Sequence, residues 1–112
     1  MLIPVLRAAG YDVTAASEGQ EALFQIRSGR KFDLIVTDLQ MPGMDGFALA
    51  RAVRVEPTTA GIPMIALSSM TTAETIERVR RAGFQDFVAK FDRPGLIAAI
   101  KEETDVEATR AA

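Results

Sequence analysis

The chain has 112 residues, of which 48% are hydrophobic, and 13 basic against 15 acidic side chains give a formal net charge of −2. These values indicate one globular domain and disfavour direct nucleic-acid binding, since the few basic residues are scattered. The sequence contains no histidine and no cysteine, which excludes disulfides, thiolate nucleophiles and a histidine general base or phosphoacceptor in this chain. Its chemistry must therefore use carboxylates, hydroxyls, lysine or bound hard cations.

The N-terminal part predicts a helix, a weak strand and a second helix. Residues 1–9 have helical spacing of apolar residues, and Gly10 is the expected stop. Residues 11–16 are rich in β-formers with polar alternation, as expected near a sheet edge. Ser17 and Gln20 form a capping box, and this second helix should end at Gly29. No apolar run approaches the ~20 residues of a membrane span, so we expect a cytoplasmic protein without a membrane contact.

Three apolar runs without polar alternation follow, at residues 34–36, 64–67 and 87–89. Such runs are typical of strands buried on both faces of a parallel sheet. The segments between and after them have helical spacing, with expected N-terminal caps at Asp45, at Thr71 with Glu74, and at Asp92. This alternation predicts an α/β fold, with right-handed crossovers and helices on both faces of the sheet.

A polar residue follows each of these three strands: Asp38, Ser68 and Lys90. The carboxyl ends of parallel strands meet at one edge of the sheet, where the functional crevice of open α/β sheets lies. A carboxylate, a hydroxyl and an ammonium group are therefore expected together, within reach of a small anion. The pattern indicates a site that handles phosphate.

The stretch Thr37-Asp38-Leu39-Gln40-Met41-Pro42-Gly43-Met44-Asp45-Gly46, with Ser68 and Lys90 at their spacing, strongly resembles the receiver domain of two-component response regulators. The resemblance covers residues 1–103, and residues 104–112 are expected to form a charged flexible tail. It implies a flavodoxin-like, doubly wound parallel sheet. It also implies phosphorelay signal transduction, with a histidine kinase or phosphotransfer domain as the partner.

The resemblance assigns a role to each site residue. Asp38 would be the phosphoacceptor, while Ser68 hydrogen-bonds a phosphoryl oxygen and Lys90 neutralises another. Mg²⁺ would be held by Asp38, by the backbone carbonyl of Gln40 and by an acid following the first strand. Phe87, three residues before Lys90, would change its packing on phosphorylation and act as a switch.

Two features depart from the family pattern. The sequence begins inside the family's first helix, so the central first strand and its acidic pair, roughly 12 to 20 residues, are expected to be missing. Mg²⁺ binding should then be weakened, and the strand at 11–16 should pair either with 33–38 or between chains in a homodimer or strand-exchanged oligomer. The second departure, Lys90-Phe91-Asp92-Arg93, resembles the C-terminal receivers of hybrid chemotaxis-type histidine kinases.

Other interpretations of the same residues stay open. The domain could be a phosphorylation-independent interaction module that has lost its metal site. A phosphatase of the aspartyl-phosphate type is less favoured, because Gln40 stands where such enzymes need a second acid. Asp45 is expected to cap a helix rather than bind metal. Arg78, Arg80 and Arg81 are expected to form a solvated helix face, with a docking face for a partner as the alternative.

Overall fold

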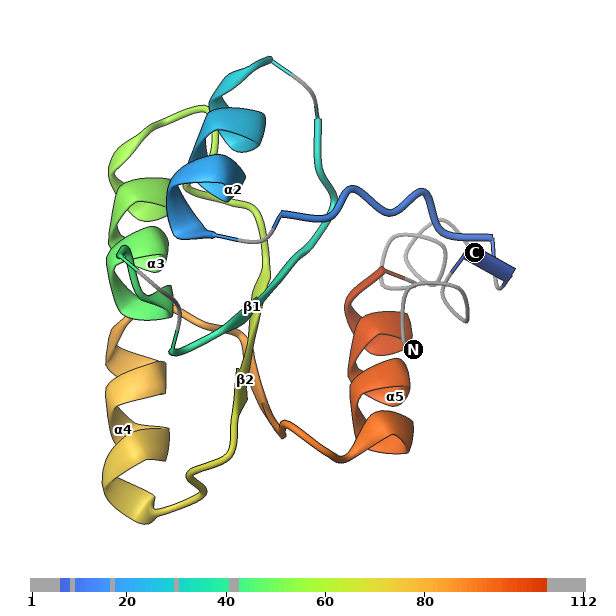
Figure 1. The fold of residues 1–112 in the computed structure, drawn as a ribbon, viewed down its shortest axis with the longest axis vertical. Coiled ribbons are helices and arrows are strands. Elements are labelled where there is room, and N and C mark those ends of the chain that lie inside the picture. Colours follow the sequence, from blue (N-terminus) through green and yellow to red (C-terminus); the bar gives the residue numbers. More distant parts are fainter. Residues whose placement is uncertain (1–6, 9, 17, 30, 41–42, 105–112) are drawn as a thin grey trace.

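The computed structural model describes residues 7–8, 10–16, 18–29, 31–40 and 43–104 (Figure 1). Helices and strands alternate along the chain in the order α2 (Gly19–Arg27), β1 (Ile35–Asp38), α3 (Gly46–Val55), β2 (Met64–Ser68), α4 (Ala73–Arg81), β3 (Asp86–Ala89) and α5 (Arg93–Thr104). The predicted α/β alternation from residue 18 onward is confirmed. Residues 7 and 8 are helical, and the rest of the helix predicted over 1–9 lies almost wholly outside the described residues. None of the described helices has the length and apolarity needed to cross a membrane.

The three strands form a parallel sheet in the order β1-β2-β3. β2 is the central strand, and Met64, Ile65 and Ala66 on it are fully buried, as its unbroken apolar run predicted. Its neighbours are held in register by the pairs Ile35↔Met64 and Ile65↔Asp86. The sheet order and the parallel direction match the flavodoxin-like fold expected from the sequence.

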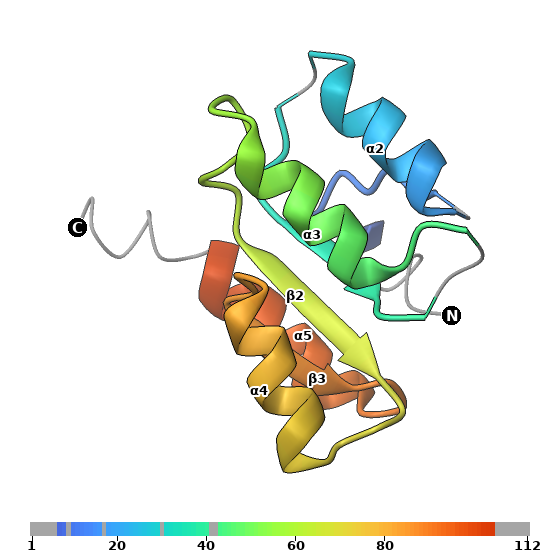
Figure 2. The ribbon, with the colours of Figure 1, turned by 90° about the vertical axis from the view of Figure 1, so that its left-hand side faces the viewer.

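Helices cover both faces of the sheet. In Figure 2, α3 and α4 lie in front of β2 and α5 lies behind it. Leu49 and Val53 of α3 and Val79 of α4 belong to the core cluster on the first face, together with Leu23 of α2. A second cluster forms where Ile100 and the other buried residues of α5 pack on Ile65 and Val88. The prediction of helices on both faces is confirmed.

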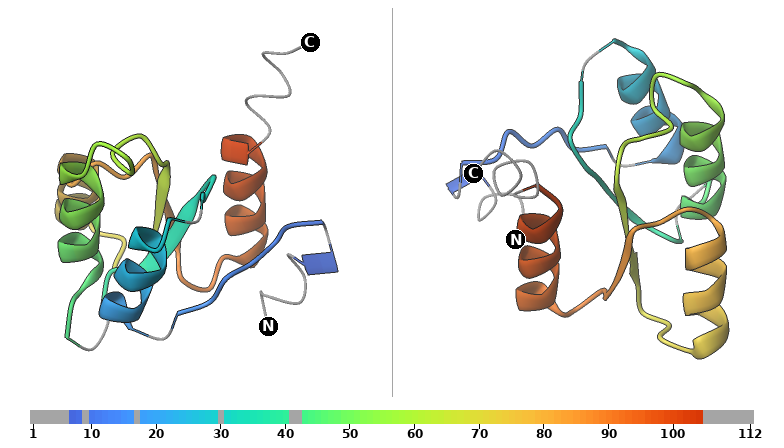
Figure 3. Two further views of the ribbon diagram at one scale, coloured as in Figure 1. Left: turned by 90° about the horizontal axis from the view of Figure 1, so that it is seen from above. Right: turned by 180° about the vertical axis from the view of Figure 1, so that it is seen from behind.

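The strand expected at 11–16 is not formed, and this prediction is wrong for the structure. These residues have no regular secondary structure, and β1 pairs with no strand other than β2 among the described residues. The segment runs from the α5 side of the sheet to the start of α2 (Figure 3). Tyr11 and Val13 pack against the α5 cluster instead of joining a ladder. A strand forms when its backbone groups hydrogen-bond to a neighbouring strand. The direct pairing of residues 11–16 with 33–38, which the sequence predicted as one option, is not formed.

Two of the four predicted helix caps, Asp45 and Asp92, are confirmed. The carboxylate of Asp45 accepts a hydrogen bond from the backbone N–H of Ala48 at 2.8 Å, so Asp45 is a helix cap. Asp92 accepts in the same way from Gly95 N–H at 3.0 Å. The cap of α4 is Thr72 rather than Thr71. The capping box proposed at Ser17 lies outside the described residues.

Candidate functional site

The three polar residues predicted to meet do lie at one edge of the sheet. Asp38 ends β1, Ser68 ends β2, and Lys90 directly follows β3. The strand register places Asp38 beside Leu67 and Ser68 beside Ala89, so the strands end at nearly the same level. The Nζ atom of Lys90 lies 3.7 Å from the Oδ2 atom of Asp38. The sequence prediction that these residues gather at the carboxyl edge is confirmed geometrically.

The Asp38–Lys90 ion pair is open to solvent. The side chains are 36% and 47% exposed, respectively, so the carboxylate is accessible from solvent. Backbone hydrogen bonds continue past the strand ends and fix both residues: Leu39 N–H donates to Leu67 C=O at 3.0 Å, and Lys90 N–H donates to Ser68 C=O at 2.9 Å. The backbone holds the pair in place while its charged atoms remain accessible.

Ser68 differs from its neighbour Ser69 in its surroundings. Ser68 is 8% exposed, whereas Ser69 is exposed. The Ser68 hydroxyl oxygen accepts a hydrogen bond from Met70 N–H at 3.0 Å. Its own hydrogen donates to no acceptor within the part of the chain that the structure describes. This O–H group is therefore oriented by the Met70 amide and available to an anion at the edge.

Gly46, the first residue of α3, packs closely against the end of β1. The sequence did not predict this contact. The Gly46 N–H donates to Leu39 C=O at 3.0 Å, which folds the loop back onto the strand end. A Cβ at position 46 would collide with the carbonyl oxygen of Asp38 and lie 2.9 Å from the Cα of Leu39. Only glycine lets the start of α3 approach the end of β1 this closely. In the sequence, the glycine directly after Asp45 in the motif was the feature that could have indicated this close approach.

The described residues offer part of the donor set that Mg²⁺ requires. Asp38 contributes a carboxylate, and Gln40, exposed two residues later, has the backbone carbonyl that the family resemblance assigns to the metal. Nowhere in the described ranges do three or more acidic side chains form a group that could hold a metal ion. Mg²⁺ prefers octahedral oxygen ligation with several waters retained. These two donors alone therefore fit the ion incompletely.

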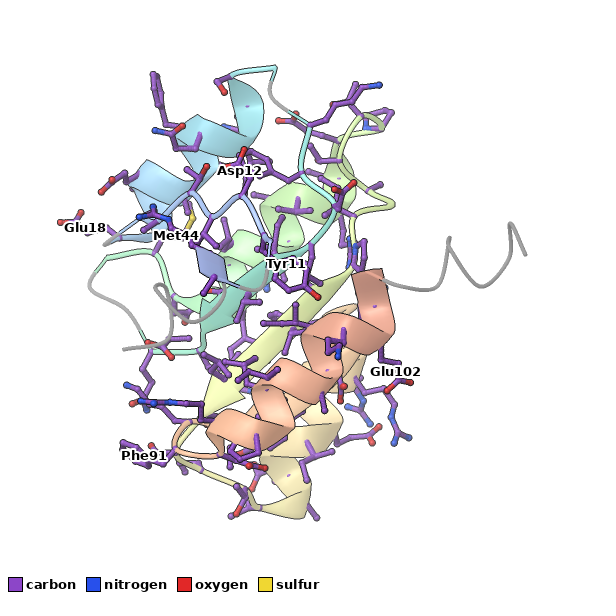
Figure 4. All side chains as sticks on the ribbon, turned by 90° about the vertical axis from the view of Figure 1, so that its right-hand side faces the viewer. Tyr11, Asp12, Glu18, Met44, Phe91 and Glu102 are labelled. Carbon is purple, nitrogen blue, oxygen red and sulfur yellow. The ribbon has the colours of Figure 1, made fainter. Side chains whose placement is uncertain are left out.

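Two aromatic residues flank the site at different depths. Phe87 on β3 pairs in register with Ala66, is half-buried, and packs against the cluster beneath α2, α3 and α4. Phe91, which follows Lys90, is 87% exposed and projects outward where the chain enters α5 (Figure 4). Phe87 thus couples the strand leading to Lys90 to the helix packing, whereas Phe91 contacts mainly solvent.

Comparison with known proteins gives one consistent family. The family described as "Response regulator receiver domain" matches residues 1–101. A gliding motility regulatory protein of Myxococcus xanthus is 40% identical over 86 residues, which are 77% of this chain and 11% of that protein. The chain therefore spans about a tenth of this curated relative.

Solved structures agree with the sequence comparison. The chemotaxis response regulator CheY4 of Vibrio cholerae has a TM-score of 0.84 and 31% identity, over 92% of this chain and 86% of its own. The receiver domain of a sensor histidine kinase from Pseudomonas aeruginosa PAO1, described with a magnesium ion coordinated in its active-site cleft, has a TM-score of 0.76 and 29% identity, over 88% and 81% of the chains.

Proposed function

The chain belongs to the response regulator receiver domain family of two-component signalling, and from this premise we propose that Asp38 is its phosphoacceptor. The observation that carries the proposal is the placement of the Asp38 carboxylate 3.7 Å from the Lys90 ammonium, beside the oriented hydroxyl of Ser68. The phosphoryl donor is a histidine kinase or phosphotransfer domain. These 112 residues contain no histidine, so the donor histidine lies outside them, elsewhere in the same polypeptide or on another chain.

The proposed reaction is an in-line displacement at phosphorus. A carboxylate oxygen of Asp38 forms a bond to phosphorus while the bond from phosphorus to the donor's imidazole nitrogen breaks, and that nitrogen keeps the electron pair. The product is an acyl phosphate on Asp38. With acetyl phosphate as the donor, the bond to the acetate oxygen breaks and acetate leaves. No proton needs to be removed from the nucleophile, because the attacking group is a carboxylate oxygen.

Lys90 and Ser68 stabilise the charge on the transferred group. The Lys90 ammonium now paired with Asp38 is free to contact a phosphoryl oxygen once the carboxylate is esterified, and the charge-assisted contact offsets the added negative charge. The Ser68 hydroxyl hydrogen donates to another phosphoryl oxygen. Phe87 is proposed to repack when these contacts form, because its strand leads directly to Lys90.

Mg²⁺ belongs to the proposal as a weakly held cofactor. Asp38 and the Gln40 carbonyl would contribute to its ligation, and a bound hard cation would neutralise phosphoryl charge as a Lewis acid. Weak binding is proposed because the described residues supply an incomplete donor set.

The cellular setting is proposed from the sequence. Lys90-Phe91-Asp92-Arg93 favours a receiver attached to a chemotaxis-type histidine kinase in the cytoplasm. Because β1 pairs on one side only within the described part of the chain, a homodimer that exchanges strands stays part of the proposal. Light scattering after size-exclusion chromatography tests it, and a strict monomer at high concentration contradicts it.

Acetyl phosphate with Mg²⁺ provides the direct test of phosphorylation. The expected result is a mass increase of one phosphoryl group on the intact chain, lost in Asp38→Asn and retained in Asp45→Asn. Asp45 is the matched control because it lies in the same loop and serves as a helix cap, a role that asparagine also fills. Phosphorylation of Asp38→Asn would contradict the assignment.

The alternative function, a phosphorylation-independent interaction module, gives a different result. Neither acetyl phosphate nor beryllofluoride would then change the mass or the NMR spectrum of a folded chain at saturating Mg²⁺. A response at high Mg²⁺ that fades at low Mg²⁺ supports a receiver with a weakened metal site.

A further inference from the structure

A groove of about 440 Å³ lies between α3 and α4, on the helical face seen in Figure 2. Its α3 wall is formed by Phe47, Arg51, Arg54 and Val55, which share one face of the helix by their spacing. Val55 is 69% exposed, an unusual position for a large aliphatic side chain on an otherwise charged helix end. This α3–α4 groove thus combines basic and apolar surface.

The α4 wall adds Arg78, Arg81 and Ala82. The guanidinium carbon of Arg78 lies 4.4 Å from the ring centroid of Phe47, a cation–π contact that bridges the two helices. Arg80 is also exposed on α4 but does not line the groove. The sequence grouped Arg78, Arg80 and Arg81 as one helix face, whereas the structure separates Arg80 from the other two.

Arg54 adds a partly buried positive charge to the lining of the groove. Its guanidinium group donates to the carbonyls of Ala60, Ile62 and Gly83 at 2.6–3.3 Å, and to the side-chain oxygen of Gln85 at 3.0 Å. Burial lowers the pKa of this guanidinium, but arginine remains protonated in proteins. All of these acceptors are neutral, so the charge of Arg54 is not balanced by a carboxylate.

The remaining arginines leave the groove with excess positive charge. Arg81 forms an ion pair with Glu77 at 3.3 Å. Within the described ranges, neither Arg51 nor Arg78 has a carboxylate at ion-pair distance. Arg51 and Arg78 are therefore available to bind an anion, and Arg54 adds positive charge that no carboxylate balances. The groove thus has a local positive field although the net charge of the whole chain is −2.

We propose that the α3–α4 groove is a docking site for an acidic amphipathic segment of a partner protein. Carboxylates of such a segment would bind Arg51 and Arg78, which can present two parallel N–H donors to each carboxylate. Apolar side chains of the same segment would cover Val55 and the exposed part of Phe47. The volume of the groove suits a few side chains rather than a folded domain.

A peptide fits the surroundings of the groove better than a nucleic acid does. Glu77 lies on the α4 side, and Glu56, which pairs with Arg27, follows Val55 on the α3 side. An extended phosphate backbone leaving the groove would meet these carboxylates, whereas a short segment ends before reaching them. None of the groove residues lies at the edge of the sheet that holds Asp38, Ser68 and Lys90, so the proposal does not rest on phosphorylation of Asp38.

The binding test uses the full chain and a fluorescein-labelled synthetic peptide built from Glu-Leu-Leu-Glu repeats. Fluorescence anisotropy measures its affinity, and backbone amide NMR maps its contacts on the unaltered protein. We expect shifts centred on Arg51, Val55, Arg78 and Ala82, and affinity that falls as salt increases. The double variant Arg51→Gln/Arg78→Gln should weaken binding about tenfold, while Arg80→Gln should leave it unchanged.

Four results of the peptide experiments would overturn the proposal. They are equal binding of a matched peptide with glutamine in place of glutamate, equal sensitivity to Arg80→Gln, NMR shifts outside the groove, and the absence of binding. Tighter binding of a duplex DNA that depends on Arg51 and Arg78 would also overturn it, in favour of a nucleic-acid site. Thermal unfolding of each variant checks that an effect does not come from loss of the fold.

Discussion

The backbone of Gly46 lies directly against the backbone of Asp38, so closely that a Cβ at position 46 would collide with the Asp38 carbonyl oxygen. The same residue donates its N–H to Leu39 C=O at 3.0 Å. The start of α3 therefore rests on the residue proposed to accept phosphate. A change at Gly46 would disturb the acceptor without touching its side chain.

Replacing Gly46 by alanine should destabilise the fold by about 1–3 kcal/mol, because the added methyl group forces the backbone of Asp38 to move. Phosphorylation by acetyl phosphate should slow as well, since the carboxylate is displaced. Urea unfolding and intact-mass kinetics measure the two effects. Gly61→Ala is the control: a Cβ there meets no atom within 4 Å. Equal stability of Gly46→Ala and Gly61→Ala would contradict the close contact.

The sheet and the site edge were predictable from the sequence for a physical reason. Strands buried on both faces need unbroken apolar runs, and residues 64–67 show this most clearly, since Met64 and Ile65 are fully buried. Once parallel pairing is inferred, the residues after the strands must share an edge. The 3.7 Å approach of Lys90 to Asp38 follows from that topology.

Features that depend on a specific partner could not be predicted in this way. Residues 11–16 have the composition of a strand, but strand formation requires a neighbouring ladder, and Tyr11 instead packs toward α5. Thr71 and Thr72 are chemically alike, so the sequence could not decide which caps α4. The contact of Gly46 with Asp38 depends on loop geometry.

Lys90→Met should slow phosphorylation of Asp38 by acetyl phosphate about a hundredfold, because the ammonium group that stabilises the developing charge is removed while the aliphatic stem remains. The free energy of unfolding should change by less than about 1 kcal/mol, since the Asp38–Lys90 pair is substantially exposed. Single-turnover mass measurements and urea unfolding separate the two effects. Lys31→Met, at an exposed position before the start of β1, whereas Asp38 ends that strand, should leave both quantities unchanged. An unaltered rate in Lys90→Met would refute a role for Lys90 in charge stabilisation.

Arg54→Met should lower the free energy of unfolding by about 2–3 kcal/mol. Arg54 ties the chain before β2, at Ala60 and Ile62, to the chain before β3, at Gly83. Its loss leaves these carbonyls without their charged donor. No sequence pattern indicated this role, because Gly83 lies 29 residues from Arg54. Urea unfolding measures the change, and Arg80→Met, which removes an exposed arginine, should be nearly neutral. Similar losses in both variants would mean that these hydrogen bonds contribute little.

Ser68→Ala should reduce the rate of phosphorylation about fivefold, because the transferred phosphoryl group loses one neutral hydrogen-bond donor worth about 1 kcal/mol. Stability should fall by about 1 kcal/mol or less, because the buried Ser68 side chain loses its hydrogen bond with the N–H of Met70, a residue that is itself exposed. Ser68→Thr keeps the hydroxyl and should recover most of the rate. Ser69→Ala is the matched control, since Ser69 is exposed and adjacent. Acetyl phosphate kinetics followed by intact mass compare all three variants. If Ser69→Ala slowed the reaction and Ser68→Ala did not, the hydroxyl that donates to the phosphoryl group would belong to Ser69. The hydrogen bond between Ser68 and the Met70 amide would then have only a structural role.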